Sequence, residues 1–299
     1  MTVLAIVGPT ASGKSALAVQ VAQLLDGEIV GTDSMQAYRG MDIGTATPTA
    51  DDQAGVHHHM LDMWDIDHAV SVVEFRDAAR VAIDAVLDNG RTPIVVGGSG
   101  LYVRAVLEEM DFPATDARVR EFWESRLQDI GAPALHAELA ERDPQAAAAI
   151  EVNNGRRVVR ALEVNELTGD NFIARLPDPV DRYPTVRIGL RIHRAELDAR
   201  IAARVDRMWA DGFVEEVRAL RDRGLDGVPT AGAALGYGPV LRYLAGEIDE
   251  AQARQQTVDD TRRFARRQQR WFGKDARIRW LDAGAPDLAD EVASYVTAT

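Results

Sequence analysis

Short apolar runs alternate with amphipathic stretches along the first hundred residues. The apolar runs are rich in β-branched residues, as expected of buried parallel strands, and they cover residues 3–7, 28–32 and 93–96. Between them, apolar residues recur at helical spacing from Lys14 to Leu25 and from Ser71 to Leu87. Strands that alternate with helices predict an α/β fold, a parallel sheet with right-handed crossovers and helices on its faces.

The pattern changes after residue 112. From 113 to 184 the chain predicts successive short helices and no convincing strand, and residues 186–192 then restore a strand. The rest of the chain predicts helices, the longest over residues 197–223. We therefore expect a catalytic core made of residues 1–112 and 185–299, with C-terminal helices, and an all-helical insertion over residues 113–184.

Composition narrows the class of protein. The chain has 299 residues, of which 46% are hydrophobic, enough to bury a sizeable core, and it has no cysteine. Disulfides, thiolate metal sites and a cysteine nucleophile are thereby excluded. No apolar stretch approaches the roughly 20 residues that span a bilayer, and no signal peptide is evident. We expect a soluble, cytoplasmic protein.

Charge is distributed unevenly. The formal net charge is -13, which by itself disfavours nucleic acid as a partner. Between Arg254 and Trp280, however, nine basic residues outnumber three acidic ones. One concentrated basic segment in an acidic protein suits a chosen polyanion, although a solvated, salt-bridged helix face would look the same.

The strongest motif is a P-loop. Residues 8–15 read GPTASGKS, which fits G-x-x-x-x-G-K-[ST] and lies between a predicted strand and a predicted helix, the context that the motif requires. Its glycines allow backbone N–H groups and a helix N-terminus to face a polyanion, and Lys14 adds a full charge. Ser15 is expected to place its hydroxyl on Mg²⁺. The motif leaves open which diphosphate is bound.

Asp33 follows the second predicted strand. A P-loop NTPase is expected to have an acidic residue in such a place, to hold Mg²⁺ or to position water. The loop that follows, residues 33–48, is long and dense in groups that hydrogen-bond a base, which is not a hydrolase pattern. A lone Asp here could be a strand-end cap, but beside a P-loop a functional role is favoured.

The run His57-His58-His59 suggests a metal site at first sight. Consecutive side chains point in different directions, and no carboxylate pair lies nearby in ligand spacing. We therefore do not expect these histidines to be metal ligands.

Seven segments together resemble a known family, the tRNA dimethylallyltransferases, also called tRNA isopentenyltransferases. They occur in the family's order over nearly the whole chain: GPTASGKS, DSMQAYRGMDIGTATP, HHHMLD followed by SVVEF, PIVVGGSGLYVRA, RRVVRALEV, ALGY and TRRFARRQQRWF. The resemblance implies a P-loop NTPase-like core. It also implies transfer of a dimethylallyl group from dimethylallyl diphosphate to N6 of the adenosine 3′ of the anticodon in tRNA, with release of diphosphate and with Mg²⁺ as cofactor.

The resemblance also assigns roles to residues. Asp33 matches the general base, and Lys14 and Thr10 match groups that meet the charge of the leaving diphosphate. The expected diphosphate-binding residues are Gly8, Pro9, Thr10, Ala11, Ser12, Gly13, Lys14 and Ser15, with Ser15 also on the metal. The expected tRNA-binding residues, for the anticodon stem-loop, are Asp33, Ser34, Met35, Gln36, Ser99, Arg120, Arg157, Arg160, Arg263 and Arg267. Phe264 and Trp271, interleaved with the C-terminal arginines, are expected in the core.

One position departs from the family. Ala233 stands where the family usually has Arg or Gln, a side chain that often helps to hold diphosphate or tRNA. Either an arginine elsewhere in the chain takes the place of this side chain, or activity is reduced.

The alternatives to a tRNA prenyltransferase are a P-loop small-molecule kinase, an adenylate isopentenyltransferase acting on free nucleotide, and a non-catalytic RNA-binding protein with the same fold. A monomer is expected.

Overall fold

The computed structural model describes residues 2–172, 178–228 and 230–298 and divides the chain into two units. Unit 1 comprises Met1–Glu108 and Asp181–Thr299, and unit 2 comprises Glu109–Val180. The sequence placed the insertion at 113–184, so the structural division begins and ends a few residues earlier. Residues 1, 173–177, 229 and 299 of the predicted domains lie outside the described residues.

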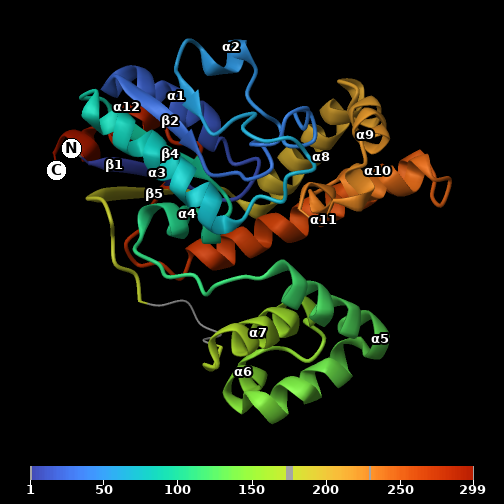
Figure 1. Ribbon diagram of the computed structural model, residues 1–299. Helices are drawn as coiled ribbons and strands as arrows, with labels where there is room; N and C mark the ends of the chain where they lie inside the picture. Colours follow the sequence, from blue (N-terminus) through green and yellow to red (C-terminus); the bar gives the residue numbers. More distant parts are fainter. Residues whose placement is uncertain (1, 173–177, 229, 299) are drawn as a thin grey trace. The chain divides into compact units, whose positions relative to one another are not determined.

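A parallel sheet forms the centre of unit 1, as the alternating pattern predicted. Its strands lie in the order β3-β2-β4-β1-β5-β6. Figure 1 labels the inner strands β2, β4, β1 and β5. Their bounds are β1 (Val3–Val7), β2 (Gly27–Gly31), β3 (His58–His59), β4 (Thr92–Gly97), β5 (Thr185–Arg191) and β6 (Arg279–Asp282). The expectation that everything after β5 is helical was wrong, because β6 is a strand. It is short, and its residues are only half-buried or exposed, so it carries little apolar pattern.

Alternation along the strands divides the core between the two faces of the sheet. On β1, Leu4 and Ile6 pack with α1 (Lys14–Leu25) and α12 (Leu288–Thr297), whereas Val3 and Ala5 pack on the opposite side. The helices of that opposite side are α3 (Val72–Asp88), α4 (Gly100–Leu107), α8 (Arg194–Ala210), α9 (Phe213–Asp222), α10 (Tyr237–Leu244) and α11 (Glu250–Phe272). The short helix α2 (Ala50–Gln53) lies in the connection between β2 and β3. Burial on both faces explains why the strands read as continuous apolar runs.

The helix predicted over residues 197–223 is two helices, α8 and α9. They are separated at Gly212, which adopts a left-handed φ of 96°. This conformation costs glycine little and ends the first helix. Across the break, the rings of Trp209 in α8 and Phe213 in α9 pack edge to face with centroids 5.4 Å apart. The apolar spacing resumes after the break, so periodicity alone could not show it.

The topology of the sheet defines where a ligand can bind. β1 and β4 are neighbours in the sheet. From β1 the chain continues to β2, toward one edge of the sheet, whereas from β4 it continues to β5, toward the other edge. In open α/β sheets such a switch point opens a crevice at the carboxyl ends of the strands. The P-loop follows β1, Asp33 follows β2, and the turn of residues 98–99 follows β4.

Within its described residues, unit 2 contains helices joined by loops and no strand, as predicted. Its helices are α5 (Ala117–Arg142), α6 (Pro144–Ala149) and α7 (Gly155–Thr168). Helix α5 is kinked at Gly131, where φ is 78°. The core of the unit consists of side chains such as Trp123, Leu135, Leu139, Val158 and Leu162, all at most 2% exposed.

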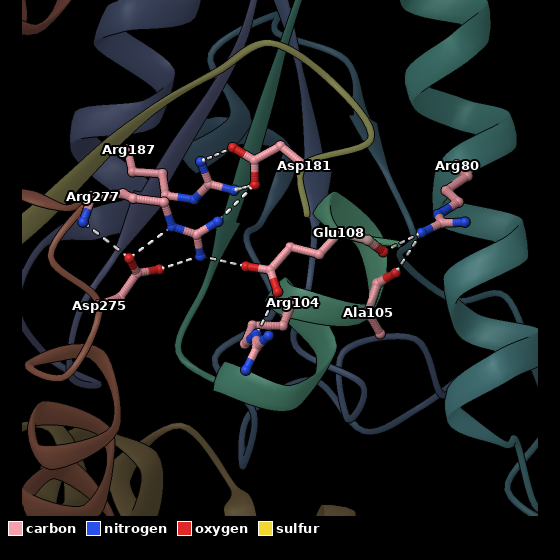
Figure 2. Close-up of polar contacts among 8 residues, drawn as sticks. All are labelled: Arg80, Arg104, Ala105, Glu108, Asp181, Arg187, Asp275 and Arg277. Atoms are coloured by element: carbon pink, nitrogen blue, oxygen red, sulfur yellow. Dashed lines mark hydrogen bonds and ion pairs between the residues drawn. The ribbon is translucent and has the colours of Figure 1, made fainter. Parts of the chain in front are cut away.

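Charged residues of unit 1 tie together the two points where the chain passes to and from unit 2 (Figure 2). Arg277 donates hydrogen bonds of 2.5 Å to Glu108 and 2.7 Å to Asp181, and it also binds Asp275. Arg187 binds Asp181 through two nitrogens, at 2.5 and 2.8 Å. Arg277 belongs to the basic segment of the sequence, so part of that segment's charge is used inside the protein.

Within the described residues, none of the helices combines the length and the apolar character needed to cross a bilayer.

Candidate active site

The P-loop lies between the end of β1 and the start of α1. Gly8 and Gly13 have φ angles of 144° and 95°, at which other residues are strained. A Cβ at Gly8 would lie 3.2 Å from the backbone oxygen of Leu190, so the packing against β5 also favours glycine. The curled backbone and the start of α1 together form the kind of loop that binds polyanions.

The side chain of Lys14 is held against this loop. Its Nζ donates a 2.6 Å hydrogen bond to the carbonyl oxygen of Pro9. Burial lowers the pKa of Lys14 to about 8; the carboxylate of Asp33 acts in the opposite direction, and the charge of Arg204 lowers the pKa further. The ammonium group is therefore charged at neutral pH but close to its titration.

Asp33 comes from the end of β2 to the same edge of the sheet. Its Oδ1 accepts a 3.1 Å hydrogen bond from the backbone N–H of Met35, which orients the carboxylate. Burial raises the pKa of Asp33, although that hydrogen bond and the charges of Arg204 and Lys14 act against the rise. A carboxylate with a raised pKa is the better proton acceptor.

Arg204 of α8 supplies a second cation that the sequence analysis did not single out. Its Nη1 donates a 3.0 Å hydrogen bond to Oγ1 of Thr10, and its Nη2 donates one of 3.2 Å to the carbonyl oxygen of Thr45. The position flanks the buried stripe formed by Ile201 and Val205. An arginine at the border of an apolar helix face is a weak signal, and no motif distinguished it from its exposed neighbours.

Helix α11 reaches the P-loop through Gln268. The Oε1 of this side chain, which is 5% exposed, accepts a 2.8 Å hydrogen bond from the backbone N–H of Thr10. A Cβ at Gly98 would lie 2.1 Å from the Nε2 of Gln268, so the turn after β4 fits this side chain only as glycine. The basic helix is thus fixed directly to the backbone of the P-loop.

The expectation that Phe264 and Trp271 are core residues was wrong. Trp271 is 39% exposed and lies against Gly100, while Phe264 is half-buried and lines the cavity described below. The core residue at this end of α11 is Phe272, at 3% exposure. The helix face that carries Phe264, Gln268 and Trp271 is turned toward the strand ends rather than toward the centre of the core.

One carboxylate, that of Glu216 on α9, shapes the polar loop after β2. Its oxygens accept the backbone N–H groups of Asp42, Ile43 and Gly44 at 2.9, 2.6 and 3.1 Å. It also accepts the hydroxyl of Tyr237 at 2.7 Å. Three backbone donors on one carboxylate fix the course of the loop. Glu216 reads as an ordinary surface position of a helix, so sequence reasoning missed it.

A cavity of about 390 Å³ gathers much of the predicted site. The predicted residues that line it are Thr10, Ala11, Gly13, Lys14, Ser15, Asp33 and Gln36. The structure thus brings the three predicted catalytic side chains to one cavity. The predicted core-unit residues that do not line it are Gly8, Pro9, Ser12, Ser34, Met35, Ser99, Arg263 and Arg267. Lining residues that were not predicted include Thr45, Asp52, Arg204, Phe264 and Gln268.

The predicted tRNA-binding arginines of unit 2 differ in their surroundings. Arg120 and Arg160 both bind the fully buried carboxylate of Glu163, at 2.8 and 2.7 Å. Although burial acts in the opposite direction, these hydrogen bonds lower the pKa of Glu163. Arg157 is exposed on α7. Arg120 and Arg160 therefore have a structural role within unit 2, and contact of all three with tRNA stays a prediction.

The arginines of α11 are more accessible. Arg263 is 56% exposed and pairs with Asp260, while Arg267 is exposed and lies over the ring of Phe264 at 5.7 Å.

Ala233, the position that departs from the family pattern, is exposed at the end of a short 3₁₀ turn. The arginine that reaches the cavity is Arg204.

Comparisons with known proteins match this architecture. A family model described as IPP transferase matches residues 36–275. The chain is 55% identical over 297 residues to a tRNA dimethylallyltransferase of Salinispora arenicola, covering 99% of this chain and 87% of the relative. A crystal structure of a tRNA isopentenylpyrophosphate transferase from Bacillus halodurans is similar with a TM-score of 0.74, at 38% identity, covering 99% of this chain and 96% of the other. A eukaryotic dimethylallyltransferase acting on tRNA shares the fold, with a TM-score of 0.76 at 24% identity over 99% of this chain and 77% of the other.

Proposed function

The chain belongs to the IPP transferase family, and from that premise we propose its reaction: transfer of a dimethylallyl group from dimethylallyl diphosphate to N6 of the adenosine 3′ of the anticodon in tRNA. The observation that carries the proposal is the meeting of Lys14 and Asp33 in one cavity at the P-loop. A cation for the leaving group and a base for the nucleophile are the two groups that this reaction needs.

The positive charges of the cavity are the groups that would meet diphosphate. Lys14 and Arg204 both line it, and Arg204 is bound to Thr10, the third predicted catalytic residue. As the allylic C–O bond breaks, negative charge develops on diphosphate and is met by these cations and by backbone N–H groups of the loop. Charges held in place in a partly buried site stabilise such a leaving group more than mobile solvent does.

Asp33 is the base that would assist the nucleophile. N6 of the adenosine attacks the allylic carbon, a C–N bond forms, and the proton on N6 passes to the carboxylate of Asp33. The lone pair of this amine is delocalised into the ring, so the amine is a weak nucleophile and benefits from a base. The raised pKa of Asp33 supports this role, because a base whose pKa lies nearer the operating pH is more effective. The adenosine must leave its stack to reach the cavity.

Mg²⁺ is the cofactor that we propose. The exposed Ser15 at the start of α1 and Asp33 line the same cavity, and hydroxyl and carboxylate oxygens are ligands that Mg²⁺ takes. The residues present thus fit the ion, and Ser15 would be its direct ligand. When bound, Mg²⁺ neutralises part of the diphosphate charge.

We propose that tRNA contacts two parts of unit 1: the exposed arginines of α11 and the cavity wall at Gln36. The exposed arginines of α11 lie on a helix that is fixed to the P-loop by Gln268, so backbone phosphates bound there would be in register with the cavity. Gln36 lines the cavity beside Asp33, where a displaced base would enter. We propose that the enzyme acts as a cytoplasmic monomer.

The test is a choice of substrates. We expect purified protein to transfer label from dimethylallyl diphosphate to unmodified tRNA in the presence of Mg²⁺, and the product nucleoside to carry the group on N6. Transfer to AMP instead of tRNA would indicate an adenylate isopentenyltransferase. Phosphate transfer from labelled ATP, without prenyl transfer, would indicate a kinase and refute the proposal.

A further inference from the structure

Two histidines and one glutamate meet at the edge of the sheet that β3 forms. Glu28 is on β2, and His57 and His59 belong to the adjacent segment around β3. One ligand atom from each residue lies within 4.8 Å of the others. The sequence analysis expected no metal ligands here, because no carboxylate pair is close in the sequence. The structure supplies a carboxylate from the neighbouring strand.

The strand pairing explains the meeting. β2 and β3 run parallel, with Ile29 opposite His58 and Val30 opposite His59. Side chains alternate along a strand, so those of Glu28, His57 and His59 share one face. His58 does not belong to the cluster, and its Nδ1 bonds to the carbonyl oxygen of residue 56 at 2.9 Å. Two histidines of the three therefore converge.

The carboxylate of Glu28 is oriented toward the histidines. Its Oε1 accepts a 2.8 Å hydrogen bond from Arg91, and its Oε2 lies 2.7 Å from Nε2 of His59. A partner that holds the second oxygen of a ligating carboxylate is a regular feature of metal sites. Arg91 also pairs with Asp26 at 3.2 Å, so the two carboxylates and one guanidinium leave a net negative charge beside the imidazoles.

We propose that Glu28, His57 and His59 bind one divalent transition-metal ion of the Zn²⁺ class. Two imidazoles and a carboxylate suit Zn²⁺, Co²⁺ or Ni²⁺, whereas Mg²⁺ prefers oxygen ligands alone. Three protein ligands leave a fourth position for water. His57 is exposed, which gives the ion a route of entry. None of its three residues is the Ser15 that we propose for Mg²⁺.

The ion would act on the edge of the sheet. β3 has only two residues, so its attachment to β2 rests on a short run of backbone pairing. An ion that both strands hold in the folded state, and that does not bind the unfolded chain, stabilises the folded state by an amount that rises with the ratio of free ion concentration to Kd. His59 also lines the active-site cavity, so the ion would fix one wall of it.

The experiment titrates full-length protein without an affinity tag with ZnCl₂, by isothermal titration calorimetry in a large excess of MgCl₂. We expect one saturable site. His57→Ala and Glu28→Gln should each weaken Zn²⁺ binding by about tenfold or more, since even the loss of groups that only orient metal ligands costs 10- to 100-fold. Zn²⁺ should raise the Tm of the wild-type protein by a few degrees, and at the same Zn²⁺ concentration it should raise that of His57→Ala clearly less.

His58→Ala and His68→Ala are the matched controls, because each removes a histidine outside the cluster. Both should keep wild-type affinity for Zn²⁺. His57 is exposed, so its variant is expected to fold and keeps the test decisive if Glu28→Gln does not. Absence of saturable binding, displacement of Zn²⁺ by Mg²⁺, or equal losses in His57→Ala and His58→Ala would overturn the proposal.

Discussion

The cavity at the P-loop and the basic face of α11 both present cations, but the fold holds these cations differently. Lys14 and Arg204 are half-buried, hydrogen-bonded and close enough to Asp33 for their charges to interact. Arg263 and Arg267 are exposed. Buried charges act at short range and are little screened by salt, whereas exposed charges act at longer range and are screened. The cavity is therefore suited to chemistry and the helix to attracting a polyanion.

The cavity side of this comparison can be tested most strongly at Asp33. Asp33→Asn keeps the shape and one acceptor oxygen but cannot take a proton. We expect kcat to fall on the order of 10²–10⁴, which is roughly 3–5 kcal/mol of barrier, while tRNA affinity is kept. Single-turnover kinetics with saturating tRNA measures the chemical step.

The control for Asp33→Asn is Asp51→Asn, which changes an exposed aspartate of α2 that does not line the cavity. Its chemical step should equal that of the wild type. Recovery of the Asp33→Asn rate at high Mg²⁺ would show that the carboxylate mainly holds the ion. A wild-type rate in Asp33→Asn would exclude the general-base role.

Lys14→Ala should have the next largest effect. Removing one preorganised donor to a developing anion costs about 10²–10³ in rate in other enzymes, and we expect a similar loss here together with a higher KM for dimethylallyl diphosphate. Steady-state kinetics at varied donor concentration measures both. The chain's other lysine provides the control, because Lys274 is exposed and its change to Ala should leave the donor KM unchanged. An unaltered donor KM in Lys14→Ala would contradict diphosphate binding at this loop.

The pH dependence tests the burial of the same group. Because the pKa of Lys14 is lowered to about 8, its ammonium loses its charge as pH rises through that value. We expect kcat/KM for the donor to fall above about pH 8, approaching tenfold per pH unit, since this ratio reports ionisations of the free enzyme. In Lys14→Arg the side chain keeps its charge at higher pH. The fall of kcat/KM at high pH should therefore begin at a higher pH or disappear. A wild-type profile that is flat up to about pH 10 would contradict the lowered pKa.

The sequence predicted the layers of the core well, because buried parallel strands and amphipathic helices leave periodic patterns. Strand β1, helix α1 and the position of Asp33 after β2 follow from local residues. Arg204, Gln268 and Glu216 could not be predicted, since each acts through contacts between segments more than 150 residues apart in the chain. Similarly, Glu28 and His57 meet only because β2 and β3 pair. The break at Gly212 was missed because the apolar spacing continues across it.

The exposed side of the comparison predicts a smaller effect that depends on salt. Each arginine of α11 that contacts a tRNA phosphate releases counterions, so its loss should reduce the log–log slope of affinity against salt by about 0.7–0.9. We expect this smaller slope for Arg263→Ala and Arg267→Ala, measured as tRNA binding over a series of salt concentrations, with affinity for dimethylallyl diphosphate unchanged.

Arg218→Ala on α9 is the control, because Arg218 is also exposed and paired with an acidic neighbour, Glu215, but is not assigned to tRNA. If the α11 variants and the control give the wild-type slope alike, the basic face of α11 is only a solvated surface. If the slope falls but the rate at saturating tRNA is kept, then the helix serves binding and the cavity serves chemistry, as their different burial indicates.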